Sequence, residues 1–300
     1  MESVTARAPA KVNLALRVGS PAPDGFHPVA TVYQAVSLYD EVTVEPAERL
    51  SVEVRGHGAA DVPADATNLA ARAAVLLAKH LGRPADVRLT ITKAIPVAGG
   101  MAGGSADAAA ALVACDALWD ANLGREALGR LGAELGSDVP FCLLGGTALG
   151  TGRGERLAPV LVRGSTHWVF ATAGAGLSTQ QVYARLDRLR GDRPIAAPVA
   201  DTDVLLALST GDLPRLGTAL VNDLQPAAIA LRTTLRATLQ TGREAGALGA
   251  VVSGSGPTCA FLAADAAHAL DVAVTLSASG TCRTVVNANG PVPGAAVVVS

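Results

Sequence analysis

The sequence contains few cysteines, and no two of them form a Cys-x-x-Cys motif. Three of the four lie in apolar runs, so we interpret them as buried free thiols of a protein that works in a reducing cytoplasm. The four residues are Cys115, Cys142, Cys259 and Cys282.

The chain also lacks an excess of charge of either sign. Its formal net charge is −2, and no basic cluster is interleaved with aromatic residues. These features argue against nucleic acid or a membrane surface as the main partner.

Long apolar segments are missing as well. The N-terminal residues, which include Glu2, Arg7 and Lys11, contain no apolar signal-peptide core. The longest uncharged stretch, residues 245–264, has the length of a membrane span, but Gly254–Thr258 divides it into two strand-sized pieces. We therefore expect a cytoplasmic protein. Its 300 residues, half of them apolar, are enough for two domains with their own cores.

Two common nucleotide-binding motifs are absent, but a different glycine-rich stretch is present. The sequence has no Gly-Lys-Ser/Thr of a Walker loop, and the stretch lacks Gly-x-Gly-x-x-Gly spacing. It follows a strand-like segment (87–92) and precedes an alanine-rich segment (106–119) that predicts a helix. The unpaired amides and positive dipole of a helix start favour an anion, so we predict phosphate binding. The stretch is Pro96, Val97, Ala98, Gly99, Gly100, Met101, Ala102, Gly103, Gly104, Ser105 and Ala106. The alternative is a simple tight connection in a chain with 32 glycines.

Two further polar residues stand out by their position. Lys11 and Asn13 share one face of an alternating segment, residues 11–18, which predicts a strand. Lys11 is one of only three lysines, and its retention suggests a role that an arginine could not fill. A solvated face of an edge strand is the alternative. Asp138 follows a predicted helix (126–135) and, taken alone, is best interpreted as a turn residue.

The remaining pattern predicts an α+β protein of two domains, residues 1–156 and 157–300. In the first domain, the five glycines of residues 145–154 suggest a second flexible loop. In the second, we expect strands at 160–162, 168–171, 248–252 and 259–262, and helices near 180–189, 203–209, 227–240 and 266–276.

Three motifs together carry a family resemblance: Pro9–Leu14, Pro96–Ser105 and Gly254–Thr258. The chain resembles, over nearly its whole length, the galactokinase–homoserine kinase–mevalonate kinase–phosphomevalonate kinase (GHMP) superfamily of small-molecule kinases. Asp24–His27 and Leu135–Phe141 are similar to the branch that phosphorylates, with ATP, the 2-hydroxyl of a cytidine-diphosphate-linked methylerythritol on the non-mevalonate route to isopentenyl diphosphate. The resemblance implies an N-terminal domain like ribosomal protein S5 domain 2, a ferredoxin-like C-terminal domain and an active site in the cleft between them.

The resemblance also implies roles for individual residues. Asp138 would be the catalytic base and Lys11 its partner, while residues 96–106 would wrap the ATP phosphates together with Mg²⁺. Ser105 would provide a hydroxyl for the phosphate or the metal, and Asn68, Leu69 and Lys93 match positions near the adenine. Relatives commonly have a second Ser followed by Asn where this chain has Ala106 and Asp107. Whether Asp107 points away from the nucleotide or acts through the metal is open at this stage.

For the substrate, Phe26 and Tyr183 match two aromatic residues that sandwich the cytosine ring. His27 matches the residue that reads the edge of the cytosine, and its backbone could supply that contact. Asn13, Thr179 and the loop of Gly254, Ser255 and Gly256 would hold the methylerythritol and diphosphate parts. Two alternatives stay open: another kinase of the superfamily, and a nucleotide-binding member without catalysis. The sequence does not choose between a monomer and a homodimer.

Overall fold

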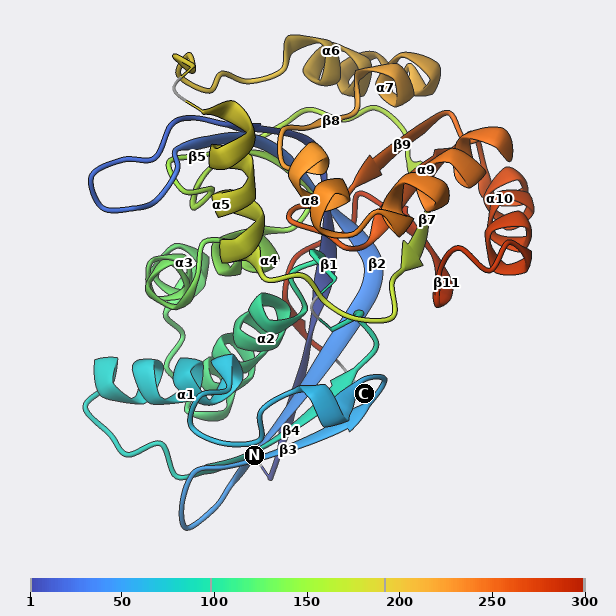
Figure 1. Ribbon diagram of the computed structural model, residues 1–300. Coiled ribbons are helices and arrows are strands. Elements are labelled where there is room, and N and C mark those ends of the chain that lie inside the picture. The colour runs from blue at the N-terminus through green and yellow to red at the C-terminus, as the bar shows by residue number, and fades with distance from the viewer. Residues whose placement is uncertain (1, 98, 192, 299–300) are drawn as a thin grey trace.

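Two β-sheets organise the chain in the computed structural model, which describes all residues except 1, 98, 192 and 299–300 (Figure 1). The larger sheet has the order β12-β1-β2-β4-β3, with β5 beside β2, β6 beside β5 and β8 beside β1. Its strands are β1 (Val4–Val18), β2 (Val29–Pro46), β3 (Ser51–Gly56), β4 (Val87–Lys93), β5 (Thr147–Thr151), β6 (Arg156–Pro159), β8 (Val221–Asn222) and β12 (Ala296–Val297).

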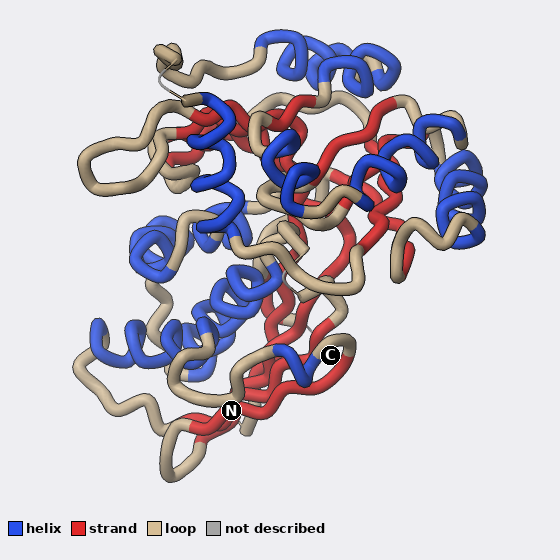
Figure 2. The backbone as a smooth tube through the Cα atoms, viewed as in Figure 1, coloured by secondary structure: helices blue, strands red, loops and turns tan. Residues whose placement is uncertain are grey.

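Helices of the N-terminal half cover this sheet, and a short 3-10 turn, η1 (Ala59–Asp61), follows β3 (Figure 2). The helices are α1 (Leu69–His80), α2 (Gly103–Leu118), α3 (Gly124–Leu135) and α4 (Val139–Leu144). Helix α2 packs against β1, β2 and α1. Most of its buried residues are alanines, whose small side chains allow a helix to lie close to a sheet. This packing fixes the N-terminus of α2 against β1, the strand that carries Lys11 and Asn13.

The smaller sheet is antiparallel and has the order β11-β7-β10-β9. Its strands are β7 (Thr166–Thr172), β9 (Gly249–Val252), β10 (Cys259–Ala263) and β11 (Thr284–Gly290). Helices α9 and α10 pack on it. The sheet therefore has the β-α-β-β-α-β connectivity of a ferredoxin-like domain. The helices of this half are α5 (Thr179–Arg190), α6 (Thr202–Thr210), α7 (Leu213–Ala219), α8 (Gln225–Leu231), α9 (Thr234–Glu244) and α10 (Ala266–Ala278).

The two-domain α+β fold predicted from the sequence is confirmed, but the halves are not separate along the chain. Strands β8 and β12 come from the C-terminal half and pair with β1, at Ala15↔Val221 and Ala6↔Val297. The boundary at residues 156/157 stays a prediction, and these two short strands lie on the far side of it.

Several local expectations were wrong. Residues 145–154 form mainly strand β5 and its turn into β6 instead of a flexible loop, because β5 pairs with β2. The strand expected at 160–162 is not present, since β6 ends at Pro159. The helix expected at 227–240 is two helices, α8 and α9, because Arg232 takes an extended conformation. Helix α7 was not predicted; Pro214 lies in its first turn, where proline is favoured.

Candidate active site

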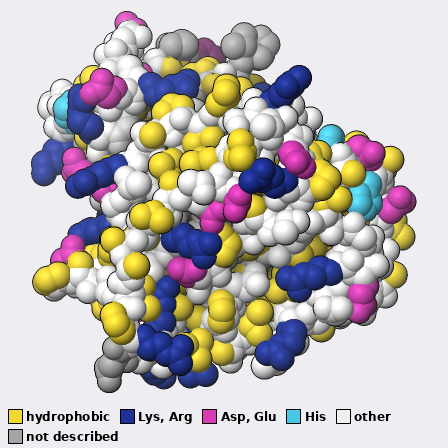
Figure 3. Space-filling model, turned by 90° about the horizontal axis from the view of Figure 1, so that it is seen from above, with side chains coloured by type: hydrophobic (Ala, Val, Ile, Leu, Met, Phe, Trp, Pro, Cys, Tyr) yellow, Lys and Arg dark blue, Asp and Glu magenta, His cyan; other side chains and the backbone are white. Residues whose placement is uncertain are grey.

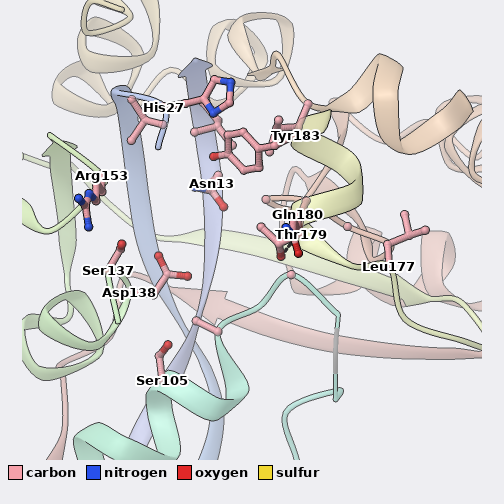
Figure 4. A pocket seen from close by; sticks show the side chains of 18 of the residues that line it. Asn13, His27, Ser105, Ser137, Asp138, Arg153, Leu177, Thr179, Gln180 and Tyr183 are labelled. Carbon is pink, nitrogen blue, oxygen red and sulfur yellow. Dashed lines mark hydrogen bonds between the residues drawn. The ribbon is translucent and has the colours of Figure 1, made fainter. Parts of the chain in front are cut away.

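A cavity of about 940 Å³ lies between the two halves of the chain. Its walls come from β1, β2, the start of α2, the start of α4, helix α5 and the loop 254–256. In Figure 4, Ser105 and Asp138 lie toward one end, His27 and Tyr183 lie toward the other, and Asn13 lies between them. The residues proposed from the sequence for phosphate, catalysis and substrate therefore meet in one place.

Lys11 and Asp138 form an ion pair at this cavity, with 3.7 Å between Lys11 Nζ and Asp138 Oδ2. Lys11 also donates to Asn13 Oδ1 at 2.6 Å, and Asn13 in turn donates to Thr31 Oγ1 at 2.8 Å. Both Lys11 and Asn13 are buried, so β1 is not an edge strand with a solvated face. The chain of hydrogen bonds holds the ammonium group toward the cavity.

Asp138 occupies the N-cap position of α4, but its side chain makes no capping hydrogen bond. The carboxylate is instead available to the cavity, with 29% of the side chain exposed. One oxygen faces Lys11 and the other accepts a hydrogen bond from the hydroxyl of Tyr33 at 3.1 Å. Sequence reasoning missed Tyr33. The available signal was the rarity of tyrosine, since the chain has only three.

The glycine-rich stretch forms the start of α2, which begins at Gly103, earlier than the expected 106. Ala102 precedes it in the left-handed region (φ 63°) and provides no side-chain cap. The first amides of α2 therefore have no side-chain acceptor and can bind an anion. Members of the stretch that line the cavity are Gly99, Gly100, Ala102, Gly103, Gly104 and Ser105.

Other members of the stretch have different surroundings. Met101 and Ala106 are fully buried, and the Met101 carbonyl accepts from the Lys11 amide at 3.2 Å. Pro96 and Val97 line a second, smaller cavity of about 430 Å³ instead. Ala98 lies outside the described residues. Direct contact between side chain and phosphate is therefore expected only from Ser105.

Among the three residues expected near the adenine, Leu69 alone lines the main cavity. Asn68 caps α1 by accepting from the Ala70 amide at 2.8 Å, and it donates to the Pro63 carbonyl at 2.7 Å. Lys93 points into the interior, where its ammonium group pairs with Asp40 and Asp107. The polar side-chain groups of Asn68 and Lys93 thus bond to other parts of the protein, and their place near the adenine stays a prediction.

Asp107 belongs to this buried cluster and points away from the cavity. It lies 2.7 Å from the Lys93 ammonium group, while its Oδ1 has no hydrogen-bond partner among the described residues. Burial raises the pKa of Asp107 to about 7, with Lys93 opposing the rise and Asp40 adding to it. The Asp107 side chain thus points away from the cavity and joins α2 to Lys93 of β4.

At the other end of the cavity, three rings gather. The rings of His27 and Tyr183 lie 4.9 Å apart, and Phe26 is half exposed at the cavity wall. His27 Nε2 lies 2.8 Å from Asp187 Oδ1, so the imidazole is already engaged. The guanidinium of Arg153 lies 3.7 Å from the centre of the Phe26 ring and pairs with Asp24. Arg153 and Asp187 were not foreseen from the sequence.

The C-terminal half contributes a loop, residues 254–256, that lies close to Lys11 and Asn13. Thr179 and Ser255 share a hydrogen bond of 2.9 Å at the cavity wall. Gly254 has φ 55°, and a Cβ built on it would lie 3.0 Å from Lys11 Nζ and 3.4 Å from Asn13 Oδ1. Only glycine allows the backbone to approach Lys11 this closely.

A metal ion would have few protein ligands in this cavity. The described residues contain no cluster of three His, Cys, Asp or Glu side chains suited to a metal. Mg²⁺ in kinases is commonly bound by substrate phosphates with one or two protein groups, so a protein cage is not needed. Ser105, at the start of α2, fits such a role, whereas the buried Asp107 does not.

On the face shown in Figure 3, Lys and Arg side chains alternate with acidic and apolar ones instead of forming a basic patch. Among the described helices, none has the length and apolar character to span a membrane.

Comparisons with known proteins agree with the geometry. Residues 68–146 match the model of the GHMP kinases N terminal domain, and residues 204–282 match that of the GHMP kinases C terminal domain. The chain is 59% identical to a 4-diphosphocytidyl-2-C-methyl-D-erythritol kinase of Thermobifida fusca, covering 99% of this chain and 98% of that protein. It is 58% identical to the enzyme of that name from Mycolicibacterium smegmatis, over 99% of this chain and 92% of the relative.

A solved structure agrees with these relatives. The crystal structure of a 4-(cytidine 5'-diphospho)-2C-methyl-D-erythritol kinase matches with a TM-score of 0.77 and 33% identity, covering 95% of this chain and 98% of that one. The chain therefore belongs to the GHMP kinases, and among them to the family of 4-diphosphocytidyl-2-C-methyl-D-erythritol kinases.

Proposed function

We propose that the protein transfers the γ-phosphoryl group of ATP to the 2-hydroxyl of 4-diphosphocytidyl-2-C-methyl-D-erythritol, on the non-mevalonate route to isopentenyl diphosphate. The observation that carries this proposal is the Lys11–Asp138 pair in a cavity that has an uncapped helix start toward one end and aromatic rings toward the other. Family membership implies the use of ATP.

In this proposal Asp138 accepts the proton of the attacking hydroxyl. An alcohol is a weak nucleophile at neutral pH, and a carboxylate within reach removes its proton as the bond to phosphorus forms. Lys11 stabilises the ionised carboxylate and the negative charge that develops during transfer. Asn13 fixes the Lys11 side chain, since its amide oxygen accepts from the ammonium group.

The start of α2 binds the phosphates of the nucleotide, and its dipole and uncapped amides supply positive charge. Mg²⁺ bound with the nucleotide would neutralise charge on the β- and γ-phosphates, and Ser105 is the residue that we propose to hold it. A cytoplasmic location and a monomeric or homodimeric state stay predictions.

At the substrate end, Phe26 and Tyr183 bind the cytosine by stacking, and Thr179, Ser255 and neighbouring backbone bind the diphosphate and sugar-alcohol parts. His27 is engaged by Asp187 through its ring, so we assign any contact with the cytosine edge to its backbone. Arg153 is a cation at the cavity wall and supports Phe26 from its ring face.

A comparison of two substrates tests this function. The full cytidylyl substrate should turn over with ATP, whereas methylerythritol 4-phosphate without the cytidylyl group should be a very poor substrate. Replacing Phe26 or Tyr183 by Ala should raise the KM for the full substrate at least tenfold, because stacking adds about 0.5–1.5 kcal/mol to the burial of the ring. The KM for ATP should stay the same.

The outcomes separate the alternatives. Equal turnover of both substrates, or unchanged KM in both variants, would leave only a general small-molecule kinase. No release of ADP with any substrate would favour a nucleotide-binding protein without catalysis.

A further inference from the structure

The hydroxyl of Tyr33 lies in a buried position against the proposed base. It donates to Asp138 Oδ1 at 3.1 Å, while Lys11 faces Oδ2 at 3.7 Å. Tyr33 is 3% exposed. Burial, followed by the Asp138 charge, raises the pKa of the Tyr33 hydroxyl well above its usual range. The phenol therefore keeps its proton and acts as a donor to the carboxylate.

The ring of Tyr33 is fixed by its neighbours. It stacks on Phe141, with ring centres 4.8 Å apart, and the Lys11 ammonium group lies 5.7 Å from its centre. Phe141 belongs to α4, the helix that begins just after Asp138. The same two elements, β2 and α4, thus hold the donor and the acceptor in place.

Two glycines of the β5–β6 hairpin leave room for this ring. A Cβ on Gly150 would lie 2.6 Å from Tyr33 Cε2, and a Cβ on Gly154 would lie 2.3 Å from Tyr33 Oη. Side chains at either position would displace the ring or its hydroxyl. The glycines of residues 145–154, which suggested a flexible loop, thus have a packing reason at these two positions.

We propose that Tyr33 is a positioning residue for phosphoryl transfer, whose hydroxyl orients the Asp138 carboxylate and favours its ionised form. With one oxygen held by the phenol and the other facing Lys11, the carboxylate has little freedom to rotate. A hydrogen bond to a charged group is among the stronger ones in proteins, and a donor to a carboxylate favours the ionised state. This inference rests on the proposed role of Asp138 as the base.

Among the other titratable groups that face Asp138, those with a shifted pKa lose their protons only at alkaline pH, so they do not contribute to the acid limb of a pH profile. Lys11 faces Asp138 from β1 at 3.7 Å. Burial raises the pKa of Tyr183, on α5, to about 12, and also raises the pKa of the Cys142 thiol, on α4. Asp107 titrates near neutrality but lies in the separate Asp40–Lys93–Asp107 cluster.

The test is the pH profile of kcat/KM for Tyr33→Phe, with the full-length enzyme, ATP and the cytidylyl substrate. Because the variant loses a donor that favours the ionised carboxylate, its acid limb should move to higher pH by about one unit, which is a tenfold change in proton affinity. At the plateau, kcat should fall about tenfold with little change in KM, because the base is less well oriented.

Two control variants make the comparison specific. Tyr39→Phe makes the same change on the same strand, at a half-buried tyrosine outside the cavity, and should leave the profile unchanged. Asp107→Asn, measured in parallel, identifies any part of the acid limb that belongs to the buried cluster.

Ring-fluorinated tyrosine at position 33 tests the same bond without removing an atom. Fluorine makes the phenol a stronger donor, so the acid limb should move to lower pH, opposite to the shift in Tyr33→Phe. If a thermal melt shows that Tyr33→Phe is unstable, the fluorinated enzyme provides the test of the hydrogen bond between Tyr33 and Asp138.

The results that overturn the inference are distinct from those that overturn the proposed function. If Asp138→Asn is inactive while Tyr33→Phe and the fluorinated enzyme keep the wild-type profile, Tyr33 has no positioning role and the base stands. If Asp138→Asn retains wild-type turnover, the proposed base is wrong and the inference fails with it.

Discussion

Asp107 is a carboxylate at the start of a helix that is proposed to bind phosphate, and its position explains how the two can coexist. Its side chain lies under the helix, against Lys93 and near Asp40, and it is 2% exposed. Two carboxylates share one ammonium group there, so one of them holds a proton readily. The arrangement keeps negative charge away from the nucleotide while fixing α2 to β2 and β4.

This cluster makes stability depend on pH. The pKa of Asp107 is raised to about 7, above its ordinary value, so the folded protein binds a proton more tightly than the unfolded chain. Stability should therefore fall as the pH rises from about 4 to about 7. The asparagine of Asp107→Asn cannot ionise. From about pH 4 to about pH 7 the free energy of unfolding of this variant should therefore fall by about 1–4 kcal/mol less than that of the wild type.

Urea unfolding at several pH values between about 4 and 8 measures this difference. Asp271→Asn, which changes an exposed carboxylate on α10, serves as the control and should follow the wild type. Equal pH slopes for Asp107→Asn and the wild type would mean that Asp107 is not the titrating group.

At the scale of elements, the glycine loop is held by a second loop from the other half of the chain. Ser253 Oγ donates to the Gly100 carbonyl at 3.1 Å, and the Thr258 amide donates to the Gly99 carbonyl at 3.3 Å. Gly100 has φ 76°, and a Cβ on it would lie 2.2 Å from the Ser253 carbonyl oxygen. The two loops interlock at a contact that only glycine permits.

In Gly100→Ala, the new Cβ should clash with the Ser253 carbonyl in addition to straining the backbone, so this variant should disturb the site more than strain alone would. We expect the KM for ATP to rise more than tenfold, because the clash displaces the loop that carries Gly103 and Ser105. Gly82→Ala is the matched control: Gly82 has a similar φ of 66°, but nothing lies within 4 Å of its Cβ position. That variant should lose about 1 kcal/mol of stability and keep its activity. Equal ATP kinetics in both variants would argue against the interlocked loops.

The sequence predicted most of the strands, loops and helices that carry the candidate site residues, because hydrophobic alternation and helix propensity are local properties of the chain. The alternation in residues 11–18 placed Lys11 and Asn13 on one face, and they are hydrogen-bonded. The glycine pairs and the alanine run predicted the loop and helix α2. Contacts between distant segments could not be predicted in this way. The bonds of Tyr33 to Asp138 and of Lys93 to Asp107 depend on packing between elements, which periodicity does not encode.

At the scale of the whole molecule, residues 292–298 from the end of the C-terminal half bond to the larger sheet and to α4. The Val292 carbonyl accepts from the Gly146 amide at 2.7 Å, and the Val292 amide donates to the Ala35 carbonyl at 3.2 Å. The Ala295 amide donates to the Cys142 carbonyl and the Val298 amide to the Thr5 carbonyl, both at 2.8 Å. The C-terminal segment thus bridges β1, β2 and α4.

Deleting residues 291–300 should consequently destabilise the whole protein and not just its C-terminal half. The four hydrogen bonds above are lost together with the pairing of β12 with β1. At about 0.5–1.5 kcal/mol for each bond, the four alone should lower the free energy of unfolding by about 2–6 kcal/mol. Chemical unfolding monitored by circular dichroism measures this change. A shortened chain as stable as the full one would show that the segment contributes little.

The interlocked loops also bear on how the enzyme is made. During translation, Lys11, the glycine loop and Asp138 are synthesised before residues 253–258. In the folded protein these later residues bond to Gly100 and lie close to Lys11. A nascent chain that ends before these residues therefore has the proposed catalytic pair without the contacts that hold Gly100. The contacts of Gly99 and Gly100 with Ser253 and Thr258 can form only after residues 253–258 have been synthesised, late in the chain.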